Sequence, residues 1–591
     1  MKIGRLNRAS FAKTARRAMF LFAFAALGTQ AAMVAQVGET AYETLDEAIK
    51  AVQAGETIVV NAGEYKLNGN LSYTGKAFTI QAAEGATVSF DMSAAVALHG
   101  AKITFAGVTF DYKTNKDYTG LKHTDTLVYN DCTVNGKVFL YAASETFNRC
   151  TFTQTAVDYN VWTYGAKAVT FNGCTFNCVG KSVLVYNEGS ISKTELAVSD
   201  CKFNASASVE GKAAIEIDTS LMAGGATITV DAKTTAEGFA EGSNSKSTLW
   251  NDKKQKQDTN TNTTVTVAGE TVFTPIVAKV GEKGYTTLAA ALADVAEGKP
   301  LTWVAEGAWP VKTPVYYNGT FYETGTGVAA KGALERAIDA ANAEGAAAVA
   351  KIYVRPGFAA DELVRQAHQQ LKTGLAIYGN DAKLSHNWEP CVEYPGTSGD
   401  SGAHQLTKDV SLAIYNLHNG AGFWGRRTTA YTVDLKLSGC QNAHQVMFYG
   451  NVDTGVKGKT NISVTNCTFD ATNKETGHNV LVTIGAGKVD VSDTTFTAAN
   501  INVKNVDGGD NVITVKDCVF KDTVADNQNI RVRSYVEGTH ADLTIENVTF
   551  AGASTQNVEI GDSKAECKGV VNYTITQTSG TMNVYKQGVT T

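Results

Sequence analysis

Cysteine is the residue type that most suggests chemistry in this 591-residue chain, because most of its ten cysteines recur at one position of a repeated phrase. The recurring ones are Cys132, Cys150, Cys174, Cys201, Cys440, Cys467 and Cys518. Regularly spaced thiols could bind a metal ion or form disulfides, but no histidine accompanies them at a ligand spacing. Side chains stacked in register also suit the disulfide dihedral poorly. We therefore expect free thiols that pack as small hydrophobic groups.

A second candidate for chemistry is a column of carboxylates and amides just before the repeated phrase, formed by Asn466, Asp493, Asp517 and Asn547. If these residues stack, Asp493 and Asp517 could share a Ca²⁺ ion, which is the only cofactor that the sequence suggests. Asn and Asp also suit tight turns because they tolerate left-handed backbone. Glycine stands at the equivalent position elsewhere, as Gly107, Gly173 and Gly439. We therefore expect the column to form turns, with a metal site as the alternative.

One cluster has the composition of a ligand-binding site. Trp424, Arg426 and Arg427 lie in the segment Phe423-Trp-Gly-Arg-Arg427, which we expect to be a loop between two repeats. An exposed Trp beside Arg side chains could stack on a sugar and donate paired hydrogen bonds to an acidic group. The alternative is that Trp424 packs against the flank of the repeats. No residue of the chain is identified as catalytic.

The repeated phrase itself predicts the architecture. It consists of an alternating apolar run, then Asn, Asp or Gly, then Cys-Thr-Phe or a close relative, and it returns about every 18 to 30 residues. Such a period on β-type patterning indicates a solenoid. Alternation places Ile462 and Val464 on one face, and a bend at Asn466 returns Cys467 and Phe469 to that face. The interior ladder then also contains Phe152, Phe176, Phe203, Phe469, Phe496, Phe520 and Phe550.

Three segments predict a short amphipathic helix followed by a strand. The first begins with the capping box Thr44-Leu-Asp-Glu47, the second follows Thr287, and the third contains Leu334 and Ile338. A solenoid end exposes apolar residues and unpaired strand edges, so helices of this kind are expected to cover it. The first and third helices are each followed by further strands and a ladder, which predicts two β-helical domains.

The order of these segments predicts the domains and the cellular location. Basic residues up to Arg17, an apolar stretch of about eleven residues and Thr29-Gln30-Ala31 indicate a signal peptide over 1–35. The apolar stretch is too short to span a membrane. We expect β-helices over 36–275 and 329–591, with a connecting module over 276–328. The polar tract 252–263 predicts an exposed loop. A net charge of −6 without a basic cluster beyond the signal argues against nucleic-acid binding.

The ladder and the cap helices, over about residues 37–240 and 330–590, resemble the right-handed parallel β-helix, or pectin-lyase-like, superfamily. The segment Val37-Gly-Glu recurs as Val280-Gly-Glu, and this paired arrangement is similar to that of exported β-helix repeat proteins of gut bacteria. The resemblance implies an all-β fold of two right-handed parallel β-helices, each with an N-terminal capping α-helix. The superfamily includes lyases, hydrolases and adhesins, so the fold does not decide the activity. The hydrolase signatures Asn-Thr-Asp, Asp-Asp, Gly-His-Gly and Arg-Ile-Lys are absent.

The sequence therefore favours an exported or cell-surface, adhesin-like binding protein without a recognisable catalytic site. Its partners would be extracellular glycans or the surface of a host or neighbouring cell. The alternative is a polysaccharide lyase or glycoside hydrolase with a non-standard site, and Ca²⁺ belongs to the lyase case only.

Overall fold

The computed structural model describes residues 33–591 with several gaps. The gaps are 68–69, 74–75, 101, 123–124, 188–192, 223, 327–330, 346, 359–362, 367, 394–405, 427–428, 450–457, 473–478, 485, 507, 522–527, 552–556, 562–566, 577, 581 and 588–591. Residues 1–32 of the predicted signal peptide lie outside the described residues. None of the helices in the described part of the chain has the length and hydropathy of a membrane-spanning segment.

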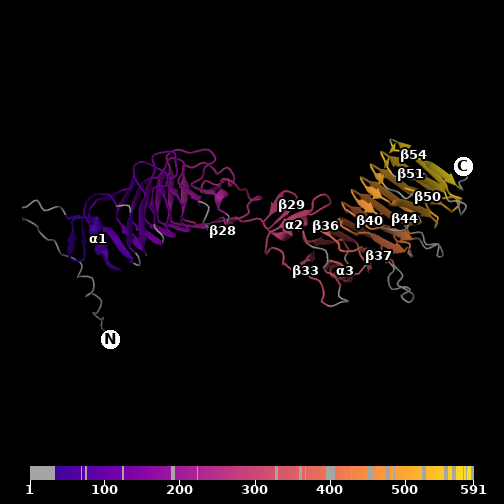
Figure 1. The fold of residues 1–591 in the computed structure, drawn as a ribbon, viewed down its shortest axis with the longest axis horizontal. Helices are drawn as coiled ribbons and strands as arrows, with labels where there is room; N and C mark the ends of the chain where they lie inside the picture. The colour runs from indigo at the N-terminus through magenta and orange to yellow at the C-terminus, as the bar shows by residue number, and fades with distance from the viewer. Residues whose placement is uncertain are drawn as a thin grey trace, which may run out of the picture. The chain divides into compact units, whose positions relative to one another are not determined.

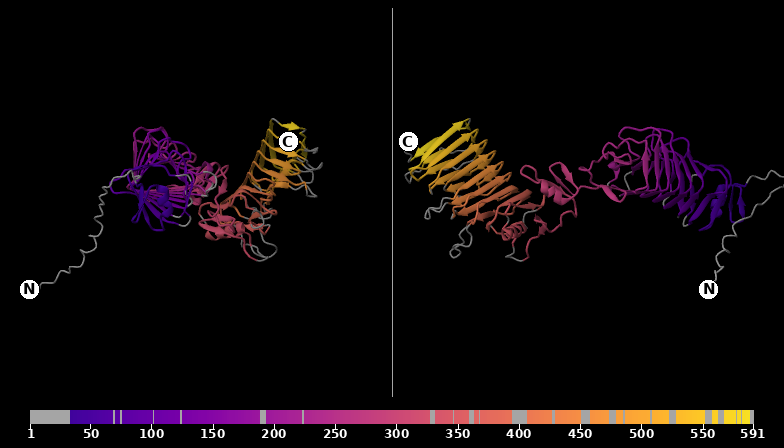
Figure 2. Two further views of the ribbon diagram at one scale, coloured as in Figure 1. Left: turned by 60° about the vertical axis from the view of Figure 1, so that its left-hand side comes forward. Right: turned by 180° about the vertical axis from the view of Figure 1, so that it is seen from behind.

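The chain forms two compact units, one of residues 1–254 and 262–272 and the other of residues 255–261 and 273–591. Residues 276–328, predicted as a connecting module, lie within the second unit. Each unit is a coil in which strands of successive turns lie side by side and parallel (Figure 1; Figure 2). The predicted all-β fold of two right-handed parallel β-helices is confirmed.

Each turn of the first coil contributes one strand to each of three walls, as β12 (Thr126–Asn130), β13 (Thr133–Gly136) and β14 (Val138–Phe139) do. The long sheet contains, in spatial order, β2 (Thr40–Tyr42), β1 (Ala35–Val37), β3 (Thr57–Val60), β6 (Phe78–Ala82), β9 (Ile103–Ala106), β12 (Thr126–Asn130), β15 (Ser144–Asn148), β18 (Ala168–Asn172), β21 (Thr194–Ser199), β24 (Ala226–Val230), β27 (Thr263–Val267) and β28 (Glu270–Phe273). The second wall contains β25 (Thr235–Glu237), β22 (Lys202–Ala205), β19 (Thr175–Cys178), β16 (Thr151–Thr153), β13 (Thr133–Gly136), β10 (Thr109–Tyr112), β7 (Val88–Asp91) and β4 (Gly63–Tyr65). The third wall consists of a short sheet, β11 (Leu121–Lys122), β8 (Val96–Gly100) and β5 (Asn70–Tyr73), and a sheet that we call the platform sheet, β14 (Val138–Phe139), β17 (Val161–Trp162), β20 (Val183–Tyr186), β23 (Ile215–Asp218) and β26 (Trp250–Asp252).

The second unit repeats this design with different loops. Its long sheet contains β33 (Thr320–Tyr322), β32 (Val315–Tyr317), β34 (Ala350–Val354), β36 (Leu375–Lys383), β38 (Val410–His418), β40 (Val433–Ser438), β42 (Thr460–Thr465), β45 (Gly487–Ser492), β48 (Asn511–Lys516), β51 (His540–Glu546) and β54 (Val570–Thr576). Another wall contains β35 (His368–Gln370), β37 (Glu389–Val392), β39 (Phe423–Arg426), β41 (Val446–Tyr449), β44 (Asn479–Ile484), β47 (Asn500–Asn505), β50 (Ile530–Ser534), β53 (Val558–Gly561) and β56 (Val584–Gln587). The third contains β43 (Thr468–Asp470), β46 (Thr495–Thr497), β49 (Val519–Lys521), β52 (Thr549–Phe550) and β55 (Ser579–Gly580), and a separate sheet contains β30 (Lys283–Tyr285), β29 (Ala278–Val280) and β31 (Leu301–Val304).

The interior of each coil is built from in-register ladders. In the first unit, Phe176 pairs with Phe152 on one side and Phe203 on the other, and the ring centroids are 4.5 Å apart in both pairs. In the second unit, Phe496 stacks in the same way between Phe469 and Phe520, at 5.3 and 4.8 Å. These side chains are at most 1% exposed. Stacking identical rings at every turn buries apolar area without voids, which is the main favourable term in the folding of a solenoid.

Antiparallel ββαβ modules begin each coil. In the first, β1 pairs with β2 and β3, and α1 (Leu45–Ala51) lies between β2 and β3 in the chain. In another, β32 pairs with β33 and β34, with α3 (Ala333–Glu344) before β34. The last strand of each module then starts the parallel stack, because β3 pairs with β6 and β34 with β36. The predicted capping box of α1 is present, with Thr44 and Glu47 exchanging hydrogen bonds of 3.2 Å.

A further ββαβ module, formed by β29, β30, α2 (Leu288–Asp294) and β31, starts no coil in the described residues. It packs instead on the outer face of the second unit's long sheet. Its buried Trp309 belongs to one apolar cluster with Tyr353 and Tyr378, whose rings stack 5.3 Å apart. Similar cap sequences thus cover the start of a coil in two modules and pack on the outer face of a sheet in the third. Sequence similarity alone did not distinguish these two arrangements.

The polar tract 252–263 is only in part the exposed loop that the sequence predicts: residues 256–259 are exposed, but other positions of the tract are buried. Asp252, Asn260 and Thr263 are fully buried. The tract is polar because its side chains satisfy backbone groups: Asp252 accepts from the Lys254 N–H at 2.9 Å, and Gln255 accepts from the Thr261 N–H at 2.8 Å. Buried polar side chains are tolerated where they replace the hydrogen bonds of water.

The turn before each ladder residue has left-handed backbone. Asn466, Asp493, Asp517 and Asn547 have φ of 51°, 50°, 52° and 53°. The glycines at the equivalent position agree, since φ is 65° at Gly107, 62° at Gly173 and 69° at Gly439. Only Gly, Asn and Asp adopt this conformation readily, so the backbone explains the residue choice without a ligand.

Asp493→Val is expected to lower the free energy of unfolding by about 1–2 kcal/mol relative to Asp493→Gly, because a β-branched side chain is strained at this φ. Urea denaturation of the two variants, followed by circular dichroism, measures the difference. Equal stability of the two variants would contradict the backbone explanation. A gain in wild-type stability on adding Ca²⁺, lost in both variants, would instead support a cation site.

Candidate ligand-binding faces

The parallel register places one outward side chain of each column on every turn of the coil, about 4.8 Å from the next. Two outer faces carry more than isolated polar residues. One is a groove on the long sheet of the second unit, and the other is the platform sheet of the first unit. Each is described separately below.

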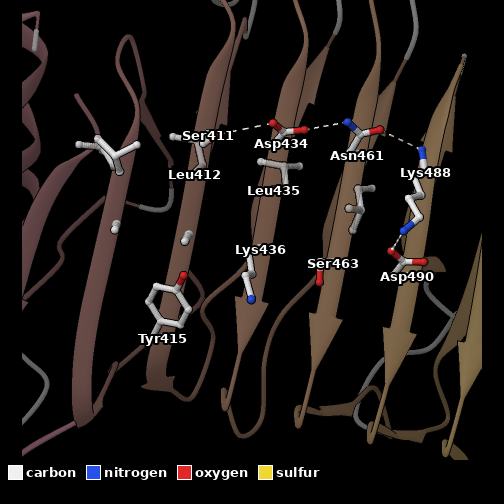
Figure 3. Close-up of a pocket in the computed structure, with 15 residues that line it drawn as sticks. Ser411, Leu412, Tyr415, Asp434, Leu435, Lys436, Asn461, Ser463, Lys488 and Asp490 are labelled. Carbon is white, nitrogen blue, oxygen red and sulfur yellow. Dashed lines mark hydrogen bonds and ion pairs between the residues drawn. The ribbon is translucent and has the colours of Figure 1, made fainter. Parts of the chain in front are cut away.

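The groove lies across β36, β38, β40, β42 and β45 and encloses about 430 Å³ (Figure 3). Its floor includes small residues such as Ala376, Ala413 and Ser463, and other polar side chains surround them. Three of these, Ser411, Asp434 and Asn461, hold consecutive positions of one outward column (Figure 3).

The platform sheet carries an aromatic row that the sequence predictions did not include. Its outward column of Tyr141, Tyr164 and Tyr186 lies beside Phe139 and Trp162, and ring centroids of neighbouring side chains are 5.2–6.4 Å apart. Phe139 is buried, and the other four are half-buried. A usable signal was present, because Phe139-Leu-Tyr141 and Trp162-Thr-Tyr164 repeat the same alternation one turn apart.

Tyr118 extends the row from a neighbouring loop. Its side chain is 54% exposed, and its ring centroid lies 5.2 Å from that of Phe139 and 5.4 Å from that of Tyr164. The loop approaches the sheet closely because residue 120 is glycine: a Cβ there would lie 2.0 Å from the Phe139 carbonyl oxygen. The Tyr141 hydroxyl donates to the Tyr118 carbonyl at 2.8 Å and fixes the loop over the row.

Charged side chains border the aromatic row. The Lys122 ammonium lies 5.5 Å from the ring centroid of Tyr141, and the Lys181 ammonium lies 5.6 Å from that of Tyr159. Lys137 bridges Asp117 and Asp158 at 2.6 and 2.7 Å. Despite the desolvation of Lys137, which acts the other way, these carboxylates raise its pKa. The lysine therefore stays charged and holds the two loops together.

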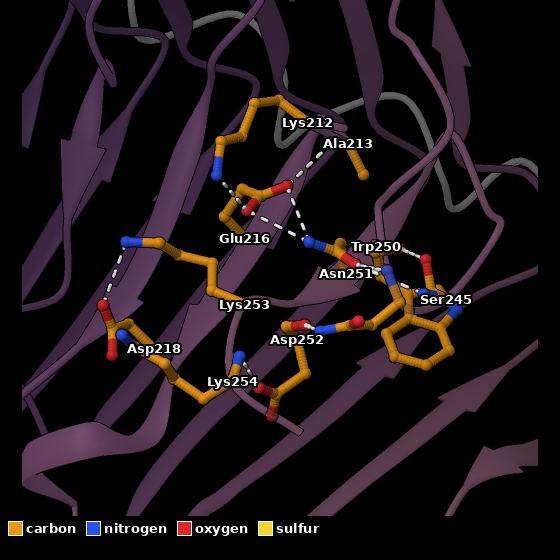
Figure 4. A network of polar contacts seen from close by, with 11 residues as sticks. Lys212, Ala213, Glu216, Asp218, Ser245, Trp250, Asn251, Asp252, Lys253 and Lys254 are labelled. Atoms are coloured by element: carbon orange, nitrogen blue, oxygen red, sulfur yellow. Dashed lines mark hydrogen bonds and ion pairs between the residues drawn. The ribbon is translucent and has the colours of Figure 1, made fainter. Parts of the chain in front are cut away.

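The platform sheet ends in a polar network (Figure 4). Glu216, on β23, accepts hydrogen bonds from the Ala213 N–H at 2.8 Å, from Lys212 at 3.3 Å and from the Asn251 amide at 3.2 Å. Asp218, two residues along the same strand, pairs with Lys253 at 2.9 Å. Glu216 is 0% exposed and Asp218 is 9% exposed, so both are enclosed by their partners.

The two carboxylates of this network have shifted pKa values of opposite sign. Burial raises the pKa of Glu216, and its hydrogen bonds only partly oppose the shift. Burial also acts to raise the pKa of Asp218, but hydrogen bonds from Ser220 and Lys253 outweigh it and lower the pKa. Separated pKa values are a feature of acid–base pairs, but such a pair must reach a substrate atom within hydrogen-bond distance. The enclosure of Glu216 argues for a structural role.

Glu145 is a second enclosed carboxylate and faces the interior of the coil. It accepts hydrogen bonds from the N–H groups of Tyr141 and Ala142 at 2.9 and 3.1 Å and from the Tyr129 hydroxyl at 3.2 Å. Burial raises its pKa to about 7. Its function is to fix the turn that follows Phe139, and hence the position of Tyr141 in the aromatic row.

The ladder cysteines are buried free thiols in the structure. Each donates to a main-chain carbonyl of the preceding turn or of its own strand, as Cys150 does to the Tyr129 oxygen at 3.4 Å. Burial raises the pKa of Cys518 to about 12, so this thiol is protonated at neutral pH. Over the described residues, no group of three or more His, Cys, Asp or Glu is placed to hold a metal ion.

Asp493 and Asp517 occupy successive turns, and Asp517 accepts from the Asn547 amide at 2.5 Å. Ca²⁺ takes six to eight oxygen ligands, so a site here would need amide, backbone or water oxygens besides these two carboxylates. The calcium site at this column stays a prediction, and no chemistry is derived from it.

Trp424 lies in strand β39, not in a loop, and is half-buried, with Cys391 and Met447 as its neighbours in register. Arg426 ends the same strand, and Arg427 lies outside the described residues. Further along this wall, Arg531 pairs with the buried Glu559 at 2.6 Å, and Arg533 donates to Asn502 at 2.6 Å. The face around Trp424 therefore remains an untested candidate.

No protein family model and no curated protein matches the chain. Among solved structures, the PL6 family alginate lyase AlyGC and an arginine-to-alanine mutant of it align over 92% of this chain and 98% of theirs. The identities are 9% and 10%, and the TM-scores are 0.15 and 0.19. These values are too low to support an inference about activity, and the fold rests on the strand pairing itself.

Glu145→Gln is expected to flatten the pH dependence of stability of the first unit. Because the pKa of Glu145 rises from 4.5 to about 7 on folding, the native state binds an extra proton between these values. This stabilisation, on the order of 3 kcal/mol, is complete below about pH 4.5 and is lost as the pH rises through 7. Urea denaturation at pH 5 and pH 8 measures it, with Glu195→Gln, a surface carboxylate, as the control. An unchanged difference between the two pH values in Glu145→Gln would contradict the assignment.

Proposed function

We propose that this protein is an exported, non-catalytic glycan-binding protein of the β-helical, adhesin-like type. The observation that carries the proposal is the aromatic row on the platform sheet, with Tyr118, Tyr141, Trp162, Tyr164 and Tyr186 half-buried or exposed along successive turns.

Aromatic rings suit sugars because the C–H faces of a pyranose stack on a π surface while the hydroxyl groups remain free to hydrogen-bond. The row spans β14, β17 and β20. Turns of the coil repeat about every 4.8 Å, which is close to the length of one sugar unit in an extended glycan. A glycan lying along the coil would therefore present one unit to each turn.

The border of the row supplies the polar half of such a site. Lys122 provides a donor over the Tyr141 ring, and Asp117 and Asp158 provide acceptors. Lysine donors with carboxylate acceptors match the hydroxyl and carboxyl groups of polysaccharides. The mixture of signs allows neutral as well as uronate-containing glycans.

Binding is favoured over cleavage because, among the described residues, the carboxyl groups with a raised pKa are enclosed. Glu145 faces the interior and Glu216 is covered by Lys212 and Asn251. A general acid must contact the glycosidic oxygen, and a lyase needs a base at the sugar ring. The alternative, a lyase or hydrolase with a non-standard site, is distinguished by its products.

Export through the N-terminal segment and location at the cell surface or outside the cell belong to this proposal. They rest on the basic residues and the apolar stretch of residues 1–35. The partners would then be extracellular glycans or glycans of a neighbouring or host cell.

Tyr164→Ala and Tyr186→Ala are each expected to weaken glycan binding about tenfold, because a lost stacking contact costs on the order of 1.4 kcal/mol. Affinity electrophoresis of the full chain in gels containing alginate, polygalacturonate, laminarin or xylan measures the loss. Tyr573→Ala is the matched control, because Tyr573 is 41% exposed but lies in the second unit.

Mass spectrometry of the same mixtures detects cleavage. New oligosaccharides from any of these polymers would replace the binding proposal by the enzyme alternative. Retention of every polymer to the same degree by wild type and both row variants would show that the aromatic row is not the binding site.

A further inference from the structure

The groove on the second unit's long sheet is an independent candidate for a binding site, because it shares no residue with the aromatic row. Its hollow has a simple origin. Outward positions of adjacent strands carry Ala376 and Ala413 in register, and Ser463 lies two strands further along the same column. Lys436 stands between Ala413 and Ser463 in this column, and its ammonium is held by Glu297. Small side chains at these positions leave a depression between the longer ones that surround them (Figure 3).

A polar rail forms one side of the groove. Ser411 donates to Asp434 at 3.5 Å, the Asn461 amide donates to Asp434 at 2.7 Å, and the Lys488 N–H donates to the Asn461 oxygen at 3.1 Å. Lys488 then pairs through its ammonium with Asp490 at 2.5 Å. The planar carboxylate and amide are thus held in fixed orientations before any ligand arrives, which lowers the entropy cost of binding.

The opposite side of the groove is also fixed. Lys436 pairs with Glu297 at 2.6 Å, and Glu297 accepts from Ser438 at 3.0 Å. Glu297 follows helix α2 of the ββαβ module that packs on this face. Tyr415 completes this side, with its ring stacked 5.1 Å from that of Tyr378. The module therefore helps to build the wall of the groove.

The charges of the groove select the class of ligand. Its two lysines, Lys436 and Lys488, each have a carboxylate partner, and Asp434 is held by neutral donors. Such a surface offers an anionic ligand no uncompensated positive charge. It offers hydroxyl-rich ligands a carboxylate, an amide, hydroxyls and an aromatic side chain. The groove lies on the face of a sheet. Unlike a sheet edge, this face presents no free backbone groups with which a peptide strand could pair.

We propose that this groove binds a short neutral oligosaccharide. Asp434 accepts hydrogen bonds from the hydroxyl groups of the sugar, Asn461 donates hydrogen bonds to them, and Tyr415 contacts the face of a sugar ring. A volume of about 430 Å³ lies in the lower part of the range of small-ligand sites, which suits two or three sugar units. The protein would then have a glycan-binding site on each of its two units.

The chain contains a matched control for the rail. Asp542 and Asn572 occupy the same outward column on β51 and β54, and the Asn572 amide donates to Asp542 at 2.8 Å. This pair repeats the chemistry and register of Asp434 with Asn461 but lies outside the groove. Asp434→Ala and Asp542→Ala therefore make the same chemical change at a groove position and at a control position.

Isothermal titration calorimetry on the full chain, with cello-, manno- and xylo-oligosaccharides of two to four units, tests the proposal. At least one neutral series should bind, and Asp434→Ala should weaken it about tenfold or more while Asp542→Ala leaves it unchanged. All of these titrations are made on chains that also carry Tyr164→Ala and Tyr186→Ala, which weaken the aromatic row, so that groove binding is separated from the proposed function. Oligogalacturonates of the same length serve as the charged comparison.

A second pair of variants tests the hollow itself without removing a hydrogen bond of the rail. Ser463→Phe fills the floor and should abolish binding, whereas Thr544→Phe, in the same column beyond the groove, should not. Thermal melting of each variant, measured alongside, checks that it is folded. Binding that survives Ser463→Phe, equal losses in Asp434→Ala and Asp542→Ala, tighter binding of oligogalacturonate, or no binding of any neutral series would each overturn the proposal.

Discussion

Parallel stacking is the constraint on which the rest of this protein depends. Every turn of the coil must pair its backbone with the turn before and the turn after, because an unpaired buried N–H or C=O costs free energy comparable to a lost hydrogen bond. The pairing fixes the register, and the register forces side chains of successive turns into columns. Phe152, Phe176 and Phe203 form an interior column for this reason, and Tyr141, Tyr164 and Tyr186 an exterior one.

The same constraint creates a problem at the start of a coil, where a strand edge and the apolar core would be open. The ββαβ modules solve it twice, by reversing strand direction so that an antiparallel hairpin and a helix cover the edge. The module that contains α2 uses its apolar face differently. It covers the column of Tyr353 and Tyr378 and places Glu297 beside Lys436. A ββαβ module of the same type as those that cover the coil ends thereby forms part of the wall of the groove.

The two units have the same β-helical fold, but their outer faces differ in chemistry. The platform sheet exposes rings, and its carboxylates at Glu216 and Asp218 are enclosed by lysines and amides. The groove of the second unit exposes oriented polar groups over a floor of small residues. We propose both faces as sugar-binding sites, one through ring stacking and the other through hydrogen bonds. A rigid coil suits this use because it holds successive contacts at a fixed spacing.

The sequence by itself determined the solenoid, the interior ladders and the capping helices, because these depend on local alternation and on a repeat that is visible in one dimension. Asn466 and Cys467 reveal a bend and an inward position without any knowledge of their neighbours in space. Only the tertiary structure decided the faces. Trp424, which the sequence placed in a loop, lies within a strand. Asp434 and Asn461 become partners because their strands are adjacent in register, although 27 residues separate them in the chain. The physical reason is that a repeat fixes which side chains point outward, while loop lengths and packed modules decide which of them remain exposed together.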